Sequence, residues 1–445
     1  MKLIFSYFKR AVCKFPKHFF VAMGLILIIT GLNTFVPVGL RQFLNEVEKS
    51  NSYGTIVLGI GFFTLYLFIQ VFVKIAWYES LDRFGGKYIE SLTLDAERAL
   101  AEASYYDIDR INPSVVRNVL YTDIFNVFRI IGHTAPSMLG AIAVILAALG
   151  TSFVYEHRMT VLILFATVLG IILSLCSRKI LSKTAGKTNS KMKVHDAWCT
   201  QFVEMLPVIQ NNSILPYYQQ KTSDNLRNFI ETAIKEDRHT IFWSEIISGY
   251  HSLFSIILSA LLAIPLAKNS IANLMFFTMI ANLTMEQAQL LETQFQALIK
   301  THVSFSHVDE LLNLPKRQTG NEEKAFSSIT FCDVVFKYPN GTQGLRNISC
   351  SIHKGDFIRL SGSNGSGKST FIKLLTGLYP PSDGEILLDG VPLSDYAQDE
   401  LNRHILYVSQ DEKCLNETFQ KYLTIITGRS LENEQFLELL DCVRL

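Results

Sequence analysis

The sequence predicts a membrane-embedded α-helical domain followed by a mixed α/β domain, on three observations. Of the 445 residues, 49% are hydrophobic and only 18% are charged, whereas about 25% of an average soluble domain is charged. The apolar residues gather in long blocks, all before about residue 300. Beyond residue 315, short β-type runs alternate with turns around a glycine-rich loop. This composition excludes a single soluble domain and a disordered chain.

Six blocks are apolar and long enough, or nearly so, to span a membrane as helices. A helix needs about 20 mostly apolar residues to cross a hydrocarbon layer of roughly 30 Å. The sixth block is the weakest because Glu286 and Gln287 interrupt it. We expect six transmembrane helices, at Phe19–Leu40, Thr55–Trp77, Ile130–Tyr155, Met159–Cys176, Ile241–Ala267 and Ile271–Gln289.

Lysine and arginine are concentrated at the N-terminus and in the two long connections, residues 78–129 and 177–240. The three other loops hold only Arg41, Lys49, Arg158 and Lys268. Because basic loops stay on the cytoplasmic side, we predict a multi-pass protein of the cell membrane with both termini in the cytoplasm. The lipid bilayer is then its first partner, and a net charge of +1 argues against a nucleic acid as another.

Residues 2–15 are predicted to form an amphipathic helix at the cytoplasmic surface of the membrane. The lysines and arginines of this helix fall outside its apolar arc, where they suit anionic headgroups. The alternative is that this helix simply continues the first span. At 100° per residue, one face about 100° wide collects apolar side chains, namely Ile4, Phe5, Phe8, Val12 and Phe15.

The two long connections are not loop-like in composition. Glu79–Tyr106 and Arg178–Glu204 contain no proline, and their charged residues are interspersed with regularly spaced apolar ones. We expect the membrane helices to continue through them into the cytoplasm. Turn-rich segments interrupt both connections, at Tyr105–Pro113 and at Pro207–Asn212. The sequence thus predicts two helical hairpins whose tips contact a cytoplasmic domain.

A short polar connector separates the two predicted domains. We divide the chain into a transmembrane domain at residues 1–315, a linker at 316–325 and an α/β domain at 326–445. One helix, Lys368–Leu378, is expected in the α/β domain. The β-type runs of this domain are Ile329–Phe336, Leu345–Ile352, Phe357–Leu360, Ile386–Leu388 and Ile405–Val408.

One motif in the α/β domain carries chemistry, a full match to G-x-x-x-x-G-K-[ST]. It follows the run Phe357–Leu360 and opens the helix at Lys368, as a phosphate-binding loop requires. In such a loop, backbone N–H groups and the helix N-terminus attract phosphates. The motif consists of Gly362, Ser363, Asn364, Gly365, Ser366, Gly367, Lys368 and Ser369, and Thr370 follows it.

These residues predict a site for ATP with Mg²⁺. Lys368 is expected to contact the β- and γ-phosphates, and the Ser369 hydroxyl is expected to hold Mg²⁺. Thr370 belongs to the same candidate site. The structural alternative is a turn rich in glycine and serine that happens to include a lysine.

With these features together, the chain resembles an exporter-type ATP-binding-cassette half-transporter. The resemblance implies that the α/β domain is a P-loop NTPase domain, incomplete here. It also implies that Tyr338 stacks on adenine, although by residue type alone Tyr338 equally caps a strand end. The segment Tyr407–Asp411 is similar to the family's glutamine loop, which implies that Gln410 binds Mg²⁺ through its amide oxygen. Thr376–Gly384 is also similar to the family's pattern.

The 445 residues depart from the family pattern after this segment. They contain no Leu-Ser-Gly-Gly-Gln-type signature, no second acidic strand motif (Walker B) and no histidine in the switch position. Hydrolysis of ATP needs a base or water-positioning carboxylate together with stabilisation of transition-state charge. We therefore expect no catalytic residue in this chain and no ATP hydrolysis by it. We interpret the sequence as a truncated product or an incomplete sequence rather than a deliberate short form.

The resemblance implies ATP-dependent export of a peptide, lipid or drug-like substrate by a dimer with a second half-transporter, identical or different. The alternative is a non-catalytic membrane subunit or regulator that binds ATP or pairs with a complete partner. Within the spans, Glu245, His251 and Glu286 are candidates to line a cavity that selects a cationic or peptidic substrate. A wet inner vestibule without selectivity explains these three residues equally well.

Overall fold

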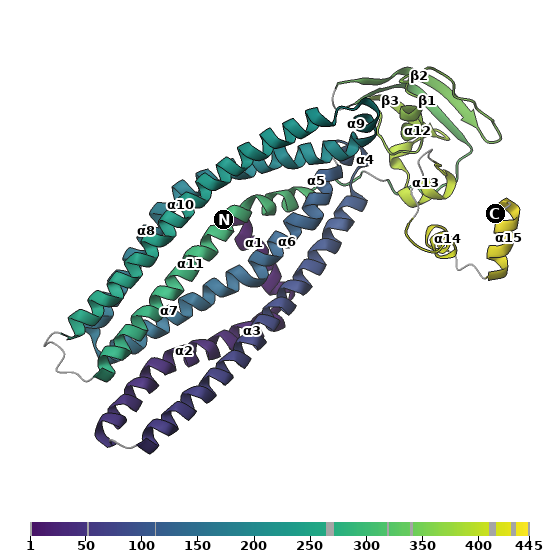
Figure 1. Cartoon of the computed structure of the whole chain (residues 1–445). Coiled ribbons are helices and arrows are strands. Elements are labelled where there is room, and N and C mark those ends of the chain that lie inside the picture. The colour runs from purple at the N-terminus through teal and green to yellow at the C-terminus, as the bar shows by residue number, and fades with distance from the viewer. Residues whose placement is uncertain are drawn as a thin grey trace. The chain divides into compact units, whose positions relative to one another are not determined.

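The structure is a computed structural model, and it describes residues 2–50, 53–111, 113–263, 271–317, 320–338, 341–408, 415–428 and 433–443. By its internal contacts the chain divides into two compact units. Unit 1 comprises Met1–Glu102 and Ile111–Leu314, and unit 2 comprises Ala103–Arg110 and Pro315–Leu445. Figure 1 labels the elements of both units. A short segment from the first third of the chain therefore belongs to unit 2.

Unit 1 is built of helices, and three of them are much longer than a membrane is thick. Helix α3 has 50 residues, α8 has 48 and α10 has 49. At 1.5 Å per residue each measures about 75 Å, so more than half of each extends beyond a hydrocarbon layer of roughly 30 Å. The elements of unit 1 are α1 (Lys2–Lys14), α2 (Pro16–Ser50), α3 (Tyr53–Glu102), α5 (Pro113–Asn118), η1 (Val119–Asp123), α6 (Ile124–Phe128), η2 (Arg129–Thr134), α7 (Ala135–Tyr155), α8 (His157–Glu204), α9 (Leu206–Asn212), α10 (Leu215–Ala263) and α11 (Ile271–Leu312).

Each predicted apolar block lies on one or more of these elements. The six blocks fall, in order, on α2, α3, η2 with α7, α8, α10 and α11. By length and composition, three described stretches are able to cross a membrane, Pro16–Lys49, Tyr53–Glu102 and Val115–Tyr155. His157–Leu173 is a shorter apolar stretch. The end of the fifth predicted span, residues 264–267, lies outside the described residues.

The N-terminal helix α1 buries a face that overlaps the predicted apolar one, since Ile4 is buried and most other residues of that face pack against the same core. Tyr7 and Ala11 are fully buried, whereas Phe5 is 70% exposed. The Tyr7 hydroxyl donates a hydrogen bond to Oδ1 of Asp309 on α11 (3.1 Å), and its ring lies edge-on against Phe305. The predicted face did not include Tyr7, which is buried because a tyrosine whose hydroxyl has a partner packs against protein as well as an apolar residue does.

Helices α3 and η2 cross at two glycines. A Cβ atom on Gly85 would lie 2.6 Å from the ring of Phe128 and 3.0 Å from the Cα atom of Gly132. A Cβ atom on Gly132 would in turn lie 3.1 Å from the Cα atom of Gly85. The two backbones approach this closely because neither residue has a side chain. The crossing sits next to Phe84 and Ile131, which are both fully buried.

Unit 2 contains a four-stranded antiparallel sheet in the order β2-β1-β3-β4. In its centre Phe331 of β1 pairs with Cys350 of β2 on one side and with Ile386 of β3 on the other. Its apolar core joins the sheet to helix α12 through Phe331, which stacks on Phe371. The elements of unit 2 are α4 (Tyr105–Ile108), β1 (Ser328–Lys337), β2 (Gln343–His353), α12 (Lys368–Leu375), β3 (Asp383–Leu388), β4 (Val391–Pro392), η3 (Leu393–Asp395), α13 (Gln398–His404), α14 (Phe419–Thr427) and α15 (Asn433–Val443).

Two predicted β-type runs are not strands in this structure. Phe357–Leu360 and Ile405–Val408 have no regular secondary structure. Most of their side chains are exposed to solvent, Phe357 to 98% and Leu406 to 88%, whereas Ile405 is partly buried. A strand requires a neighbour that accepts and donates its backbone hydrogen bonds. The sheet built from the described residues offers neither run such a neighbour. The two runs therefore have the composition of strands but do not form strands in this structure.

The predicted helix Lys368–Leu378 ends three residues early, at Leu375. The Thr376 hydroxyl donates a hydrogen bond to the carbonyl oxygen of Ile372, and Gly377 adopts a φ angle of 66°. A residue in the left-handed region stops a helix, and glycine adopts that conformation without strain. The chain turns here, and the ring of Tyr379 stacks on Phe336 of β1.

Candidate nucleotide-binding site

The glycine-rich loop is shaped by two glycines in the left-handed region, Gly365 with a φ angle of 80° and Gly367 with 92°. A Cβ atom on Gly367 would also lie 2.4 Å from the carbonyl oxygen of Gly344 and 2.7 Å from a methyl group of Leu345. Gly367 is therefore required both by its backbone conformation and by its contact with β2. The loop is held directly against the sheet at this point.

The first half of the loop closes as a tight turn. The backbone N–H of Ser366 donates to the carbonyl oxygen of Ser363 (3.2 Å). A Cβ atom on Gly362 would lie 2.6 Å from Oγ of Ser366. The residues from Gly362 to Ser366, including Asn364, are exposed to solvent. The first half of the loop is thus a tight turn that is open to solvent.

Lys368 is the first residue of α12, and its ammonium group lies against the loop. Its Nζ atom donates to the carbonyl oxygens of Gly362 and Ser363, at 2.8 Å each. The next residue, Ser369, is exposed in the first turn of the same helix. A cationic group and unpaired backbone N–H groups at a helix N-terminus form a site that suits phosphate oxygens. The residues present therefore fit a nucleotide, and the Ser369 hydroxyl is available as a Mg²⁺ ligand.

The structure brings Tyr338 and Thr370 together. Their hydroxyl oxygens lie 2.7 Å apart, although the two residues are 32 positions apart in the chain. Thr370 is buried, with 4% of its surface exposed, so its hydroxyl faces Tyr338 within the protein. The Tyr338 ring packs edge-on against Phe336, with ring centres 5.0 Å apart. The candidate base-stacking residue is thus joined to the helix that carries Lys368.

Gln410 lies outside the described residues, as do its neighbours Ser409 and Asp411. The preceding Val408 is 72% exposed. Among the residues that the structure describes, no group of three or more histidine, cysteine or acidic side chains is arranged to hold a metal ion. The Mg²⁺ roles expected for Ser369 and Gln410 therefore remain predictions.

Sequence reasoning missed Tyr379, which is 1% exposed and touches both α12 and the segment Ala103–Arg110. Its hydroxyl donates to Oδ2 of Asp109 (2.5 Å) and accepts a hydrogen bond from Nζ of Lys373 (2.9 Å). Burial, followed by the hydrogen bond to the Asp109 carboxylate, raises the pKa of Tyr379 well above its usual range. The hydroxyl therefore stays protonated and keeps its donor role. The one available signal was the family-like segment around Tyr379.

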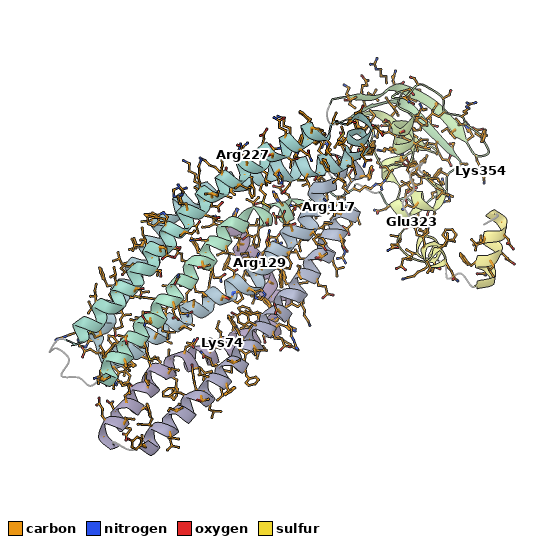
Figure 2. The ribbon with its side chains drawn as sticks, in the orientation of Figure 1. Lys74, Arg117, Arg129, Arg227, Glu323 and Lys354 are labelled. Carbon is orange, nitrogen blue, oxygen red and sulfur yellow. The ribbon has the colours of Figure 1, made fainter. Side chains whose placement is uncertain are left out.

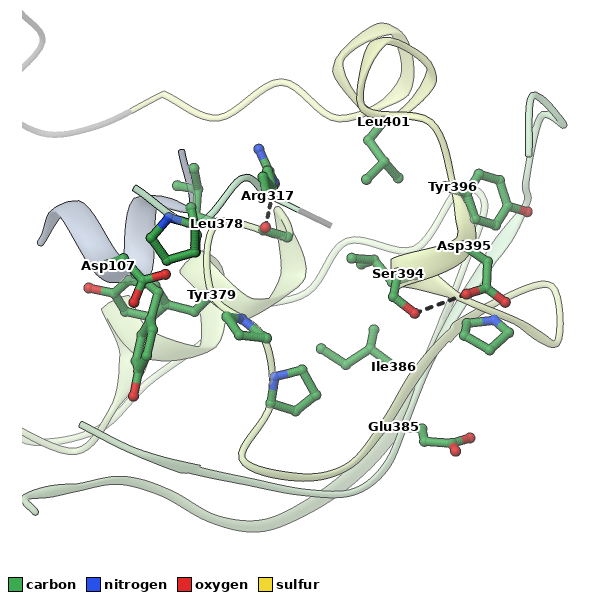
Figure 3. A pocket seen from close by; sticks show the side chains of 18 of the residues that line it. Asp107, Arg317, Leu378, Tyr379, Glu385, Ile386, Ser394, Asp395, Tyr396 and Leu401 are labelled. Carbon is green, nitrogen blue, oxygen red and sulfur yellow. Dashed lines mark hydrogen bonds between the residues drawn. The ribbon is translucent and has the colours of Figure 1, made fainter. Parts of the chain in front are cut away.

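A cavity of about 620 Å³ lies beside this contact (Figure 3). Its apolar lining residues include Ile386, Leu393 and Leu401. Arg317 also lines it and donates to the carbonyl oxygen of Gly377, and burial lowers the pKa of this guanidinium. The described lining residues do not include the glycine-rich loop. The cavity is thus distinct from the candidate nucleotide site.

The charged residues expected to line a membrane cavity are not joined in this structure. Glu245 and Glu286 are both exposed, and among the described side chains no hydrogen bond or ion pair joins them. The His251 side chain lies outside the described ones. The polar residue Gln70 joins α3 to α2, because its Nε2 donates a hydrogen bond to Oδ1 of Asn33 (2.8 Å).

Two protein families match the chain, one on each side of the polar connector. Residues 19–288, more than half of the chain, match the ABC transporter transmembrane region. Residues 345–443, which include the whole glycine-rich loop, match the ABC transporter family.

Individual proteins resemble the chain less completely. It is 30% identical to the subtilin transport ATP-binding protein SpaT of Bacillus subtilis over 195 residues, which cover 42% of this chain and 32% of SpaT. It is 27% identical to the β-(1→2)glucan export ATP-binding/permease protein NdvA of Rhizobium etli over 282 residues, 60% of this chain and 47% of NdvA. The aligned residues thus span about a third of one relative and about half of the other.

Among solved structures, a bacterial Atm1-family ABC exporter with ATP bound has the same fold. The TM-score is 0.80 at 15% sequence identity, and the match covers 93% of this chain and 74% of that one. At this identity the likeness concerns the fold alone. The likeness agrees with the predicted fold, a helical unit followed by a unit that contains a small sheet.

Proposed function

Because the chain belongs to the ABC transporter family, we propose that it is a half-transporter that uses ATP to export a substrate across the membrane in which it is embedded. The observation that carries this proposal is the loop at Gly362–Ser369, whose glycine geometry and helix N-terminus fit the phosphates of a nucleotide. The same chain carries the apolar helices that a membrane permease needs. Both halves of an ATP-driven permease are thus represented.

The nucleotide would be held by residues of the loop and of α12. Lys368 and backbone N–H groups of the loop would bind the β- and γ-phosphates. The Ser369 hydroxyl, and Gln410 as the sequence suggests, would bind Mg²⁺, which neutralises phosphate charge when it is bound. Tyr338 would stack on the adenine ring. Thr370 acts indirectly in this arrangement, because its buried hydroxyl orients Tyr338.

The nucleotide site is tested by equilibrium binding of a fluorescent ATP analogue to the full chain in detergent. Lys368→Ala removes the ammonium group and should abolish measurable binding. Lys354→Ala is the matched control, because Lys354 is an exposed lysine of the same unit outside the loop (Figure 2). Binding to Lys368→Ala at the wild-type affinity would contradict the assignment.

We further propose that these 445 residues bind ATP without hydrolysing it. Lys368 and Gln410 carry no carboxylate, and the residues contain no signature and no Walker B motif to supply the missing groups. Release of inorganic phosphate from Mg–ATP by the purified chain measures this directly. Sustained turnover by the chain without an added partner would overturn the proposal.

The proposed partner is a second half-transporter, identical or different.

The positions of basic residues support the proposal that both termini are cytoplasmic. Arg117 and Arg227 both lie toward the end of unit 1 that is remote from the α2–α3 connection (Figure 2), and basic segments stay on the cytoplasmic side. The substrate is proposed to be a peptide, a lipid or a drug-like compound. The two relatives are named for different cargoes, subtilin and β-(1→2)glucan. Labelling of the termini by a membrane-impermeant reagent, in intact and in opened cells, tests the orientation.

A second candidate function is a non-catalytic subunit that binds ATP or regulates a complete partner half-transporter. The exposed apolar runs at Phe357–Leu360 and Ile405–Val408 favour it, because such surfaces are normally covered by protein. Transport by a heterodimer with a complete half-transporter, but not by this chain alone, would distinguish it from the first.

A further inference from the structure

Helix α1 packs one side against unit 1 and leaves the opposite side exposed. The buried side, formed by Ile4, Tyr7 and Ala11, belongs to the same apolar core as parts of α3 and α11. Within the described residues, Phe5 alone of the predicted apolar face is not part of this core. Most of that face therefore contacts protein and is not available for insertion into lipid.

The exposed side of α1 carries a line of three residues, Lys2, Phe5 and Lys9, which we call the basic ridge. Spacings of three and four residues place side chains along one line of a helix. All three residues are exposed. Helices that lie on a membrane combine cations with apolar side chains, so that the apolar groups enter the boundary between headgroups and acyl chains while the cations meet anionic lipids.

The positive charge of this region is not balanced within the part of the protein that the structure describes. Residues 2–17 contain four lysines, one arginine and no acidic residue. Lys14 pairs with Asp95 (3.4 Å), whereas the ion pairs of the described residues include none for Lys2, Lys9 or Lys17. An uncompensated set of cations attracts an anionic partner.

Two aromatic contacts place the middle of α1 at the start of the first predicted span. Phe8 of α1 lies edge-on to Phe19, with ring centres 5.7 Å apart, and that span begins at Phe19. The Phe19 ring in turn packs on Phe84 of α3 (5.6 Å). The next two residues, Phe20 and Val21, are 65% and 57% exposed, and apolar side chains exposed at the start of a membrane span contact lipid. The basic ridge thus lies on a helix held where the hydrocarbon layer ends and the headgroups begin.

We propose that the basic ridge of α1 binds the headgroups of anionic phospholipids, with the Phe5 ring seated between the headgroups and the acyl chains. Anionic lipids are present on the proposed cytoplasmic side, and clusters of basic residues next to the cytoplasmic end of a membrane helix bind them. The structure assigns this role to one line of residues, because the rest of the helix packs on unit 1. Binding of this kind goes beyond ATP-driven export and does not depend on a nucleotide at Lys368.

The experiment uses Phe5→Trp in the full chain, reconstituted in vesicles of phosphatidylcholine and phosphatidylglycerol in a ratio of seven to three. In one preparation the acyl chains of the phosphatidylglycerol carry bromine, which quenches indole fluorescence on contact. In the other, an equal amount of the phosphatidylcholine carries the bromine, so that the two membranes differ only in which lipid is the quencher. The signal of the wild-type chain in the same vesicles is subtracted, because the chain has three tryptophans of its own.

We expect brominated phosphatidylglycerol to quench the introduced indole several-fold more strongly than brominated phosphatidylcholine. Lys9→Gln should lower this preference by up to about fivefold, because a lysine near an anionic surface is worth about 1 kcal/mol. Lys2→Gln/Lys9→Gln should abolish the preference. Lys14→Gln is the matched control and should leave it unchanged, since it removes the same charge from the same helix at a site that is paired with Asp95. Salt at 1 M, which shortens the screening length to about 3 Å, should act as the double variant does.

Equal quenching by the two lipids would overturn the recognition of anionic headgroups. Quenching by neither lipid would show that the basic ridge faces water and a soluble acidic partner, which also overturns the proposal. Equal losses in Lys9→Gln and Lys14→Gln would mean that net charge, and not the ridge, attracts the lipid. Circular dichroism checks that each variant is folded.

A second measurement needs no introduced tryptophan. Phospholipids that remain bound to the full chain after purification in detergent, from the same mixed vesicles, are identified and counted by mass spectrometry. The wild-type chain should retain several-fold more phosphatidylglycerol than Lys2→Gln/Lys9→Gln, and Lys14→Gln should match wild type. Equal retention by wild type and the double variant would contradict the assignment of the basic ridge.

Discussion

The hydroxyl oxygens of Tyr338 and Thr370 lie 2.7 Å apart, which ties the proposed adenine platform to the first turn of α12. Tyr338 directly follows strand β1, and Thr370 directly follows Ser369, the proposed Mg²⁺ ligand. The proposed base-binding part of the site and the helix that begins at the glycine-rich loop are therefore connected through the protein itself.

Removal of the Tyr338 ring should weaken nucleotide binding, whereas removal of its hydroxyl should not. Base–aromatic stacking contributes about 1–3 kcal/mol, so Tyr338→Ala should raise the Kd of the ATP analogue about 10-fold or more. Tyr338→Phe keeps the ring and should stay within about threefold of wild type. Fluorescence titration of both variants measures this. Equal Kd values for Ala and wild type would show that Tyr338 does not contact the base.

Gly367→Ala should disrupt the glycine-rich loop. Its φ angle of 92° strains any other residue by about 1–3 kcal/mol, and the new methyl group would lie 2.4 Å from the carbonyl oxygen of Gly344. We expect a loss of at least about 10-fold in affinity for the analogue. Gly341→Ala is the control, because Gly341 has a similar φ angle of 83° but open space around it. An affinity of Gly367→Ala as high as that of the control would refute the steric argument.

Gly85→Ala should destabilise unit 1 at the crossing of α3 and η2. The added methyl group would lie 2.6 Å from the Phe128 ring and 3.0 Å from Gly132, and overpacking of this kind costs about 1–3 kcal/mol. The neighbouring Gly86 has nothing within 4 Å, so Gly86→Ala should be neutral or stabilise the helix by up to about 1 kcal/mol. Thermal unfolding of the two variants in detergent compares them. Equal melting temperatures would contradict the close crossing.

Asp389 should make stability depend on pH at the acidic end. Its carboxylate accepts hydrogen bonds from Ser328 and Ser327, through hydroxyl and backbone N–H groups, and the Ser328 hydroxyl is the largest cause of its lowered pKa. A lowered pKa in the folded state contributes stability above the unfolded value of about 3.9, and this is lost as pH falls through the folded pKa.

The test for Asp389 is a comparison of the wild-type chain with Asp389→Asn. Asparagine retains the left-handed backbone conformation that Asp389 adopts, with a φ angle of 47°. The variant should therefore unfold more readily than wild type at pH 7, and the difference should shrink as the pH falls below about 4. A difference that is independent of pH would mean that the charge on Asp389 has no part in it.

Local patterns in the sequence account for the helices and for the glycine-rich loop. Apolar blocks of about 20 residues and the match at Gly362–Ser369 depend only on neighbours in the chain, and both appear in the structure where they were expected. The same reasoning misassigned Phe357–Leu360, because a β-type run becomes a strand only when another segment pairs with it. The apolar pattern of α1 likewise did not include Tyr7, which is buried with its hydroxyl bonded to the distant Asp309.

The sequence by itself thus determined the class of the protein, a helical membrane unit joined to a phosphate-binding α/β unit, because composition and short motifs are local properties of the chain. Only the tertiary structure brought Tyr379 to Asp109, which lies 270 residues away, and Tyr338 to Thr370. No periodicity links such residues. They meet because the chain packs the segment Ala103–Arg110, the sheet and α12 around a shared aromatic core, and side-chain packing depends on the whole fold.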